Sequence, residues 1–162
     1  IRLNDPCNLR LDGKALIDGT AWDYAYVELG DPGIPHAVVP VKNLRDFDTA
    51  KLRELGRRLR YYPEFPKGAN VNFYEIIGAD HIYERTYERG VEDFTYACGT
   101  GTGSVVTVLT LLGKVSGHQV RVDMTGGQLM VDVEREGNQV TNLYLTGPTN
   151  IVCKGEITDE AL

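Results

Sequence analysis

The sequence has few cysteines and no long hydrophobic run, and each scarcity excludes a class of protein. Its three cysteines, Cys7, Cys98 and Cys153, lie far apart, and no pair has the spacing of metal ligands. An odd number of cysteines argues against a complete disulfide framework, so we expect a reducing, cytoplasmic location and no bound metal. No apolar run approaches the roughly 20 residues that a membrane-spanning helix needs.

Positive charge is also scarce. Lysine and arginine total 17 against 23 aspartates and glutamates, which gives a net charge of −6. Nucleic-acid-binding domains usually carry a basic patch, but the densest basic stretch here, 57–60, fits the last turn of an amphipathic helix, where cations complement the helix dipole. We therefore expect neither a nucleic acid nor a membrane as a partner.

The remaining composition is typical of a globular chain. With 162 residues, of which 42% are hydrophobic and 25% charged, the chain fits one domain or two small ones. It has no internal repeat and no low-complexity segment. Because the sequence begins at Ile1 rather than at Met, there is room upstream for a leader or a preceding domain.

Hydrophobic periodicity predicts many strands and two helices, which is an α+β pattern. Asp48 can cap a helix that ends near Arg60, and Gly113 can end a second helix that begins after Cys98. The strands are predicted over 20–30, 36–41, 71–77, 82–87, 119–124, 128–134, 140–145 and 151–157, with a hairpin turn at 125–127.

The strongest candidate for chemistry is Cys98, which precedes the glycine-rich run 99–103 and an apolar stretch of helix length, 104–112. The N-terminus of a helix lowers a thiol pKa and binds anions such as carboxylates. A free cysteine can equally be a small buried core residue. Three alternating glycines, which let the backbone approach a ligand closely, favour a reactive thiolate beside a carboxylate-binding site.

Four other residues have a structural and a functional interpretation. Glu88 and Arg89 form either a surface ion pair beside a turn or partners for the ammonium and carboxylate groups of a ligand. His36 is either structural or a proton relay. Asn70 is either a turn residue or part of a strand, and in the second case Asn72 shares its face.

A rival hypothesis for the glycine-rich run is dinucleotide binding. The pattern Gly99-x-Gly101-x-Gly103 approaches the fingerprint, and Asp123 lies at a suitable distance for a ribose contact. The match is weak because the fingerprint needs G-x-G-x-x-G and because Asp123 lies in a hairpin pattern. A phosphate loop is disfavoured because no Gly-Lys-Ser/Thr follows.

Taken together, five motifs give the chain a resemblance to the C-terminal half of the diaminopimelate epimerase family. They are Gly-x-Pro-His-Ala-Val-Val (33–39), Gly-x-Asn-Val-x-Phe (68–73), Glu-Arg-Gly-Val-Glu-Asp (88–93), Ala-Cys-Gly-Thr-Gly (97–101) and Leu-Thr-Gly-Pro (145–148). The resemblance implies a mixed or antiparallel sheet wrapped around a central helix, one half of a pseudo-symmetric fold. Residues 1–148 would form this half, and 149–162 a terminal strand that packs on the absent N-terminal half.

The resemblance also implies an isomerase of lysine biosynthesis, an amino-acid racemase or epimerase that uses no cofactor. In such enzymes one cysteine, as thiolate, removes the α-proton, and a second cysteine delivers a proton to the opposite face. Cys98 would be one of the two. The backbone at Gly99 and Thr100 would hold the α-carboxylate, which also stabilises the carbanion-like transition state.

By the same resemblance, Glu88 and Arg89 would face the amino groups and the distal carboxylate of the substrate. Asn70 would help bind the distal end, and His36 would lie near the reacting centre. These roles, like those of Cys98, Gly99 and Thr100, follow from the motif positions alone.

Two departures from the family pattern modify this expectation. Ile34 replaces an asparagine that helps hold the distal carboxylate, so another amino acid, such as histidine, is an alternative substrate. Neither Cys7 nor Cys153 matches the second cysteine motif, so we expect half of an active site, inactive alone. The partner would be an N-terminal half with the second cysteine, and an unpaired last strand favours self-association into a homo-oligomer. The alternative is a binding or scaffold module that kept the fold and lost catalysis.

Overall fold

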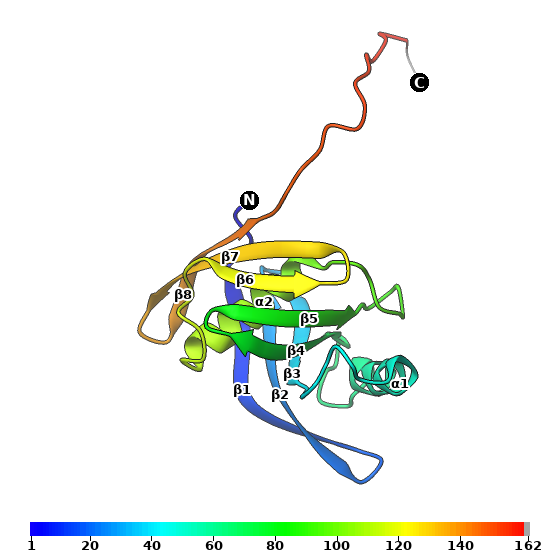
Figure 1. Ribbon diagram of the computed structural model, residues 1–162, viewed down its shortest axis with the longest axis vertical. Helices are drawn as coiled ribbons and strands as arrows, with labels where there is room; N and C mark the ends of the chain where they lie inside the picture. Colours follow the sequence, from blue (N-terminus) through cyan, green and yellow to red (C-terminus); the bar gives the residue numbers. More distant parts are fainter. Residues whose placement is uncertain (161–162) are drawn as a thin grey trace.

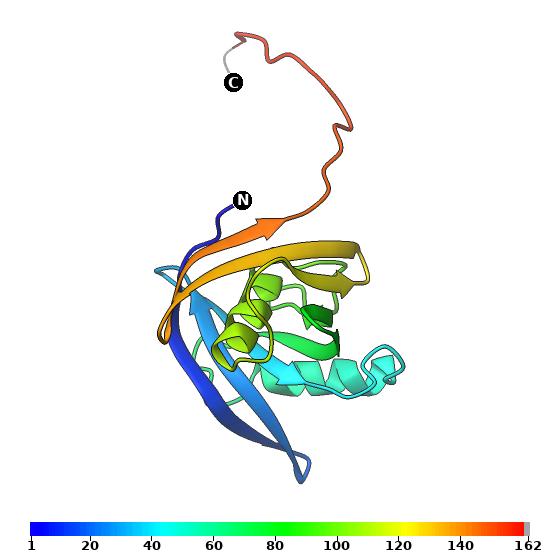
Figure 2. The same ribbon diagram turned by 60° about the vertical axis from the view of Figure 1, so that its left-hand side comes forward.

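A computed structural model describes residues 1–160, whose strands form one sheet that curls around a central helix (Figures 1 and 2). The sheet contains eight strands in chain order, each hydrogen-bonded to the next. The elements are β1 (Pro6–Ile17), β2 (Thr20–Leu29), β3 (Ile34–Pro40), α1 (Thr49–Arg60), β4 (Asn70–Gly78), β5 (His81–Tyr87), α2 (Gly99–Leu111), β6 (Val120–Met124), β7 (Gly127–Glu136) and β8 (Gln139–Thr146). The predicted fold, a mixed sheet around a helix, is confirmed.

The two helices lie on opposite faces of the sheet, and each connects a parallel strand pair. Strands β3 and β4 are parallel and joined through α1, and strands β5 and β6 are parallel and joined through α2. All other neighbouring strands are antiparallel. A parallel pair needs a long crossover connection, and a helix supplies it. Two cores result, one between the sheet and α2 and one between the opposite face and α1.

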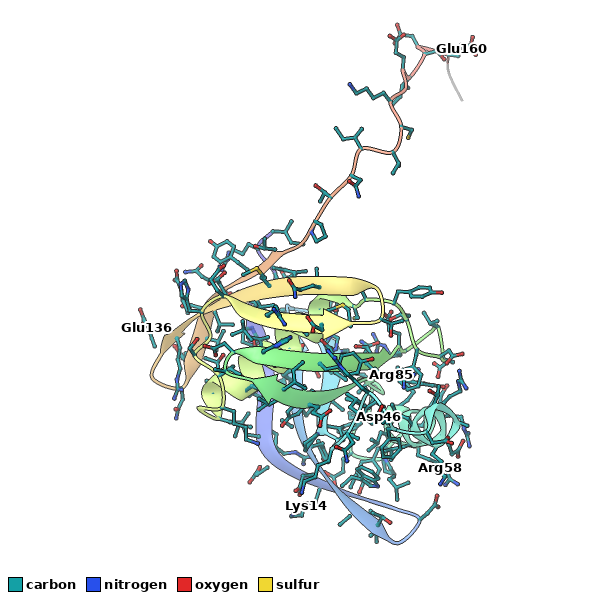
Figure 3. All side chains as sticks on the ribbon, viewed as in Figure 1. Lys14, Asp46, Arg58, Arg85, Glu136 and Glu160 are labelled. Carbon is teal, nitrogen blue, oxygen red and sulfur yellow. The ribbon has the colours of Figure 1, made fainter. Side chains whose placement is uncertain are left out.

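Helix α1 forms as its sequence predicts. The Asp48 side chain accepts a hydrogen bond from the backbone N–H of Lys51 at 2.8 Å, which caps the helix. Leu52, Leu55 and Leu59 are buried against the outer face of the sheet, and basic residues occupy the last turn. Charged side chains such as Arg58 and Asp46 lie on the outside of this region (Figure 3).

Helix α2 is buried on every side, and all residues from Gly101 to Thr110 are inaccessible. It begins at Gly99, directly after Cys98, as the sequence predicted. The small residues of its first turns let the helix approach the sheet closely. A Cβ atom added to Gly103 would lie 3.1 Å from the Leu143 side chain on β8.

The first strand was not predicted. Strand β1 pairs with β2 through a two-residue turn at Asp18 and Gly19, with Ile17 opposite Thr20. Both turn residues have positive φ, 47° and 79°, as a type I′ hairpin turn requires. An Asp-Gly pair between apolar residues is a strong hairpin signal, so the sequence did carry the information.

The strand predicted over 151–157 is wrong for this chain. Residues 147–160 form no strand and leave the body of the molecule at the end of β8 (Figure 1). Ile151 is 83% exposed and Ile157 is fully exposed. No described strand lies beside this segment, so its backbone groups face solvent. The part of the predicted terminal segment at 161–162 lies outside the described residues.

Candidate functional site

Cys98 is the residue that precedes helix α2, and its thiol lies at the positive end of the helix. Its backbone is extended, with φ −134° and ψ 102°, and its side chain makes no capping hydrogen bond. The Sγ atom lies 3.7 Å from Thr100 Oγ1 and also receives the backbone N–H of Gly101. The thiol is half-buried, so it is neither sealed in the core nor fully in solvent.

The expected acidic thiol is not found in this chain. Burial raises the pKa of Cys98 to about 11, and this effect outweighs the Thr100 hydroxyl and the Gly101 N–H, which both favour the thiolate. The nearby carboxylates of Glu88 and Glu84 raise the pKa further. The helix N-terminus does act on the sulfur, but removal from water acts more strongly.

Glu88 and Arg89 follow the end of β5 and border the same site. Glu88 Oε1 accepts a hydrogen bond from Thr95 Oγ1 at 2.6 Å, and Arg89 donates to the carbonyl of Lys67 at 3.0 Å. No ion pair joins Glu88 to Arg89 among the described residues. The Arg89 side chain is exposed and Glu88 is half-buried, so the guanidinium remains accessible to a ligand.

Asn70 is the first residue of β4 and connects two of the predicted site segments. Its Oδ1 accepts the backbone N–H of Arg89 at 2.8 Å, and its Nδ2 donates to the carbonyl of Pro35 at 3.2 Å. It is 7% exposed. Both amide atoms are therefore engaged with the backbone, so that in this chain Asn70 fixes the Glu88-Arg89 turn against the start of β3. Asn72 shares its face, as predicted for a strand.

His36 lies within β3, opposite Asn70, and not at the predicted junction between loop and strand. It is completely buried, its Nδ1 is 3.1 Å from Asn72 Nδ2, and its Nε2 has no partner. Burial lowers the pKa of His36 to about 3. The imidazole is therefore neutral at physiological pH.

A buried polar cluster lies beneath the first turn of α2, and of its members only His36 and Asn72 were expected from the sequence. It consists of His36, Asn72, Glu84, Thr86 and Thr102, each at most 4% exposed. The side chain of Thr86 bonds both Asn72 and Glu84, at 3.1 and 3.0 Å. Burial raises the pKa of Glu84 to about 7, although the hydroxyls of Thr102 and Thr86 lower it. The period-two alternation of β5 places Glu84 and Thr86 on the face of Ile82, which is the signal that could have identified them.

The structure thus brings most of the predicted site to one end of α2. Asn70 bonds the Glu88-Arg89 turn, and Glu88 acts electrostatically on Cys98. Ile34, the first residue of β3, is 38% exposed. By contrast, a cavity of about 320 Å³, lined by Tyr74, Val108, Leu112 and other residues, lies at the opposite end of α2.

The dinucleotide hypothesis loses its structural basis. The fingerprint needs a strand that turns directly into the helix, but the loop 88–98 separates β5 from α2. Asp123 bonds His81 and Arg45, at 2.8 and 3.1 Å. It pairs across the strands with Tyr83, which packs on the core of the α1 face and thus on the side away from α2.

Residues 1–160 contain no cluster of three or more histidine, cysteine, aspartate or glutamate side chains that could hold a metal ion. No described helix has both the length and the apolar character required to cross a membrane.

Comparison with known proteins agrees with this geometry. The family model for diaminopimelate epimerase matches residues 30–152. A diaminopimelate epimerase of Leptospira biflexa is 37% identical over 141 residues, covering 87% of this chain and 46% of that protein. One of Chlorobaculum tepidum is 42% identical over 139 residues, covering 85% of this chain and 51% of that protein. The chain therefore spans about half the length of the curated relatives it matches.

A solved structure shares the fold. The crystal structure of a probable proline racemase from Agrobacterium radiobacter K84 superposes with a TM-score of 0.62 at 20% identity. It covers 89% of this chain, which corresponds to 48% of that protein. At this identity the likeness concerns the fold alone.

Proposed function

Because this chain belongs to the diaminopimelate epimerase family, we propose that it is the C-terminal half of an amino-acid epimerase that uses no cofactor. Cys98 is one of two proton carriers, and an N-terminal half supplies the other. The observation that carries this proposal is the position of Cys98, immediately before α2 and beside Glu88.

The first turn of α2 suits the carboxylate of an amino acid. The leading N–H groups of a helix have no partners within the helix and attract anions. A substrate α-carboxylate at Gly99 and Thr100 would occupy this position with its α-carbon toward the thiol. When Cys98, as thiolate, takes the α-proton, the electron pair of the broken C–H bond delocalises into that carboxylate, where the N–H groups stabilise the charge.

Substrate binding would also lower the high pKa of Cys98. In the unliganded chain the carboxylate of Glu88 disfavours the thiolate. The ammonium group of an amino acid beside Glu88 would compensate that charge and bring a positive charge close to the sulfur. Opposite charges favour the ionised form, so the substrate itself would lower the thiol pKa.

A single thiol can remove and return a proton on one face but cannot invert the centre efficiently. We therefore propose that the chain alone is inactive, and that the exposed segment 147–160, with Ile151, Val152 and Ile157, packs on the N-terminal half or on a second copy of this chain.

The test combines this chain with the part of the Chlorobaculum tepidum relative that it does not match. Incorporation of deuterium from D2O at the α-carbon is followed by proton NMR, with meso-diaminopimelate and histidine offered in turn. We expect exchange with inversion of at least one of them in the mixture and no inversion by the chain alone. Cys98→Ala abolishes exchange in the mixture, whereas Cys153→Ala does not. Rapid inversion by the chain alone contradicts the proposal, and a stable mixed complex that exchanges neither amino acid favours the scaffold alternative.

The substrate is a separate question, and Ile34 is the residue that bears on it. An isoleucine cannot hydrogen-bond a distal carboxylate, and a site built around polar groups discriminates strongly between substrates. We propose that the active complex handles an amino acid with a different side chain, such as histidine, and that Ile34→Asn shifts preference toward diaminopimelate. Equal ratios of kcat/KM for the two substrates before and after the substitution would contradict this.

A further inference from the structure

We propose that Glu84, in its neutral form, is a positioning residue that fixes the tautomer of His36 through Thr86 and Asn72, and so prepares the site around Cys98. The part that concerns catalysis depends on the function proposed above. The hydrogen-bond chain itself follows from the geometry of four buried side chains and needs no substrate.

The argument begins at Asn72, whose amide orientation is determined by its neighbours. Its Nδ2 lies 3.3 Å from the carbonyl oxygen of Ala37, which can only accept. The same nitrogen lies 3.1 Å from His36 Nδ1. An amide nitrogen has two hydrogens and accepts none, so His36 Nδ1 is the acceptor and the ring hydrogen is on Nε2.

The next contact fixes the hydroxyl of Thr86. Thr86 Oγ1 lies 3.1 Å from Asn72 Oδ1, which carries no hydrogen, so the hydroxyl must donate there. A hydroxyl has one hydrogen. The remaining contact, 3.0 Å between Thr86 Oγ1 and Glu84 Oε1, must therefore be donated by Glu84. The hydrogen-bond pattern is complete only if Glu84 is protonated.

The surroundings of Glu84 favour the neutral acid. It is 2% exposed, and its Oε2 has no hydrogen-bond partner. Tyr74 lies opposite on β4, Thr102 faces it from α2, and Cys98 lies near it immediately before α2. The charged residues Arg85, Arg121 and Asp123 alternate with the inward residues of β5 and β6 and point to the other face.

A carboxylate at Glu84 would thus be buried without a cation, which is costly. The pKa of Glu84, raised by burial to about 7, agrees with this. Neutral His36, at the other end of the chain of hydrogen bonds, supplies no compensating charge.

The chain of hydrogen bonds extends to the cysteine through close packing. A Cβ atom added to Gly101 would collide with Asn72 Oδ1 and would lie 3.2 Å from Cys98 Sγ. Asn72 therefore supports the turn that carries the thiol. If Glu84 loses its proton, the Thr86 hydroxyl must turn toward it and leave Asn72 Oδ1 unpaired. The new negative charge also disfavours the Cys98 thiolate.

The test is NMR of the isolated chain labelled with ¹⁵N-histidine and ¹³C-glutamate. The histidine tautomer is determined at pH 6, and the glutamate carboxyl resonances are followed over a pH titration. We expect the Nε2–H tautomer for His36 and a carboxyl resonance of Glu84 that titrates near neutral pH. Glu84→Gln preserves the tautomer, because the glutamine amide can donate to Thr86. Thr86→Val removes the hydrogen bond to Asn72 Oδ1, so that only the carbonyl of Ala37 still orients the amide, and the Nδ1–H tautomer should become detectable. The control, Glu136→Gln at the exposed end of β7 (Figure 3), changes neither signal.

Two results would overturn the proposal: an Nδ1–H tautomer in the wild-type chain, or a Glu84 carboxyl that titrates near pH 4. If Thr86→Val does not fold, the His36 tautomer in wild type and in Glu84→Gln, together with the titration of Glu84 in wild type, still decides. The rate of Cys98 alkylation adds a functional readout. We expect equal rates for Glu84→Gln and wild type at pH 6, and a rate several-fold higher for Glu84→Gln at pH 8.5. Equal rates at both pH values contradict the coupling to the thiol. If the NMR results hold but the mixed complex lacks epimerase activity, only the proposed function fails.

Discussion

The buried carboxyl of Glu84 predicts a specific pH dependence of stability. Its pKa is raised to about 7 in the folded chain and returns to its usual 4.5 on unfolding. Between these values the folded state holds a proton that the unfolded state has released, so the free energy of unfolding falls as the pH rises. The loss continues as the pH rises through 7 and is nearly complete at pH 8. At about 1.4 kcal/mol per pKa unit, it amounts to about 3 kcal/mol.

His36 contributes with the opposite sign. Its pKa is lowered from 6.5 to about 3 by burial, so its contribution is complete above pH 6.5 and is lost as the pH falls toward 3. Between pH 4.5 and 6.5 the two slopes nearly cancel. The wild type should therefore show a plateau of stability in this window from these two groups, followed by a decline toward pH 8 from Glu84 alone.

Urea unfolding of wild type and Glu84→Gln at pH 5 and pH 8 isolates the effect of Glu84. Relative to wild type, the variant should gain about 2 to 3 kcal/mol in free energy of unfolding between the two pH values. Glu136→Gln, which is exposed, should show no such gain. If the difference between Glu84→Gln and wild type is the same at both pH values, Glu84 does not hold a proton in the folded chain and the reasoning fails.

Three other predictions concern the site and the tail. In the isolated chain at pH 8, iodoacetamide should modify Cys98 more slowly than the exposed Cys153, and the rate at Cys98 should rise up to about pH 11. Mass spectrometry of the labelled peptides measures both rates. A faster reaction at Cys98 would mean that the helix end outweighs burial. Gly101→Ala should lower the free energy of unfolding in urea by about 1 to 3 kcal/mol, because the new methyl group meets Asn72. Gly78→Ala, whose methyl group has ordinary contacts, should lower it less. Equal losses would show that the turn tolerates the added atom. Truncation after Pro148 should leave the melting temperature within about 2 °C of that of the full chain, because the removed residues are exposed. It should also reduce self-association, measured by light scattering. A large loss of stability would show that the tail packs on the rest of its own chain.

Local signals in the sequence were sufficient for much of the fold. The cap at Asp48 and the strands predicted over 71–77 and 82–87 depend only on neighbours along the chain, and the structure confirms them as the start of α1 and as β4 and β5. The turn at Asp18 and Gly19 was equally local and was overlooked. The prediction of a final strand over 151–157 is wrong for another reason. A strand needs a neighbouring strand for its hydrogen bonds, and the described residues provide none beside this segment.

The sequence by itself determined the order of the elements, the family motifs and the placement of Cys98 at the start of α2, because each depends on adjacent residues. Tertiary structure alone decided the ionisation of the site. His36, Glu84 and Cys98 come from three different elements, and their pKa values depend on how far the assembled sheet and helix remove each side chain from water. That removal depends on contacts between residues distant in the chain, which periodicity and spacing do not encode.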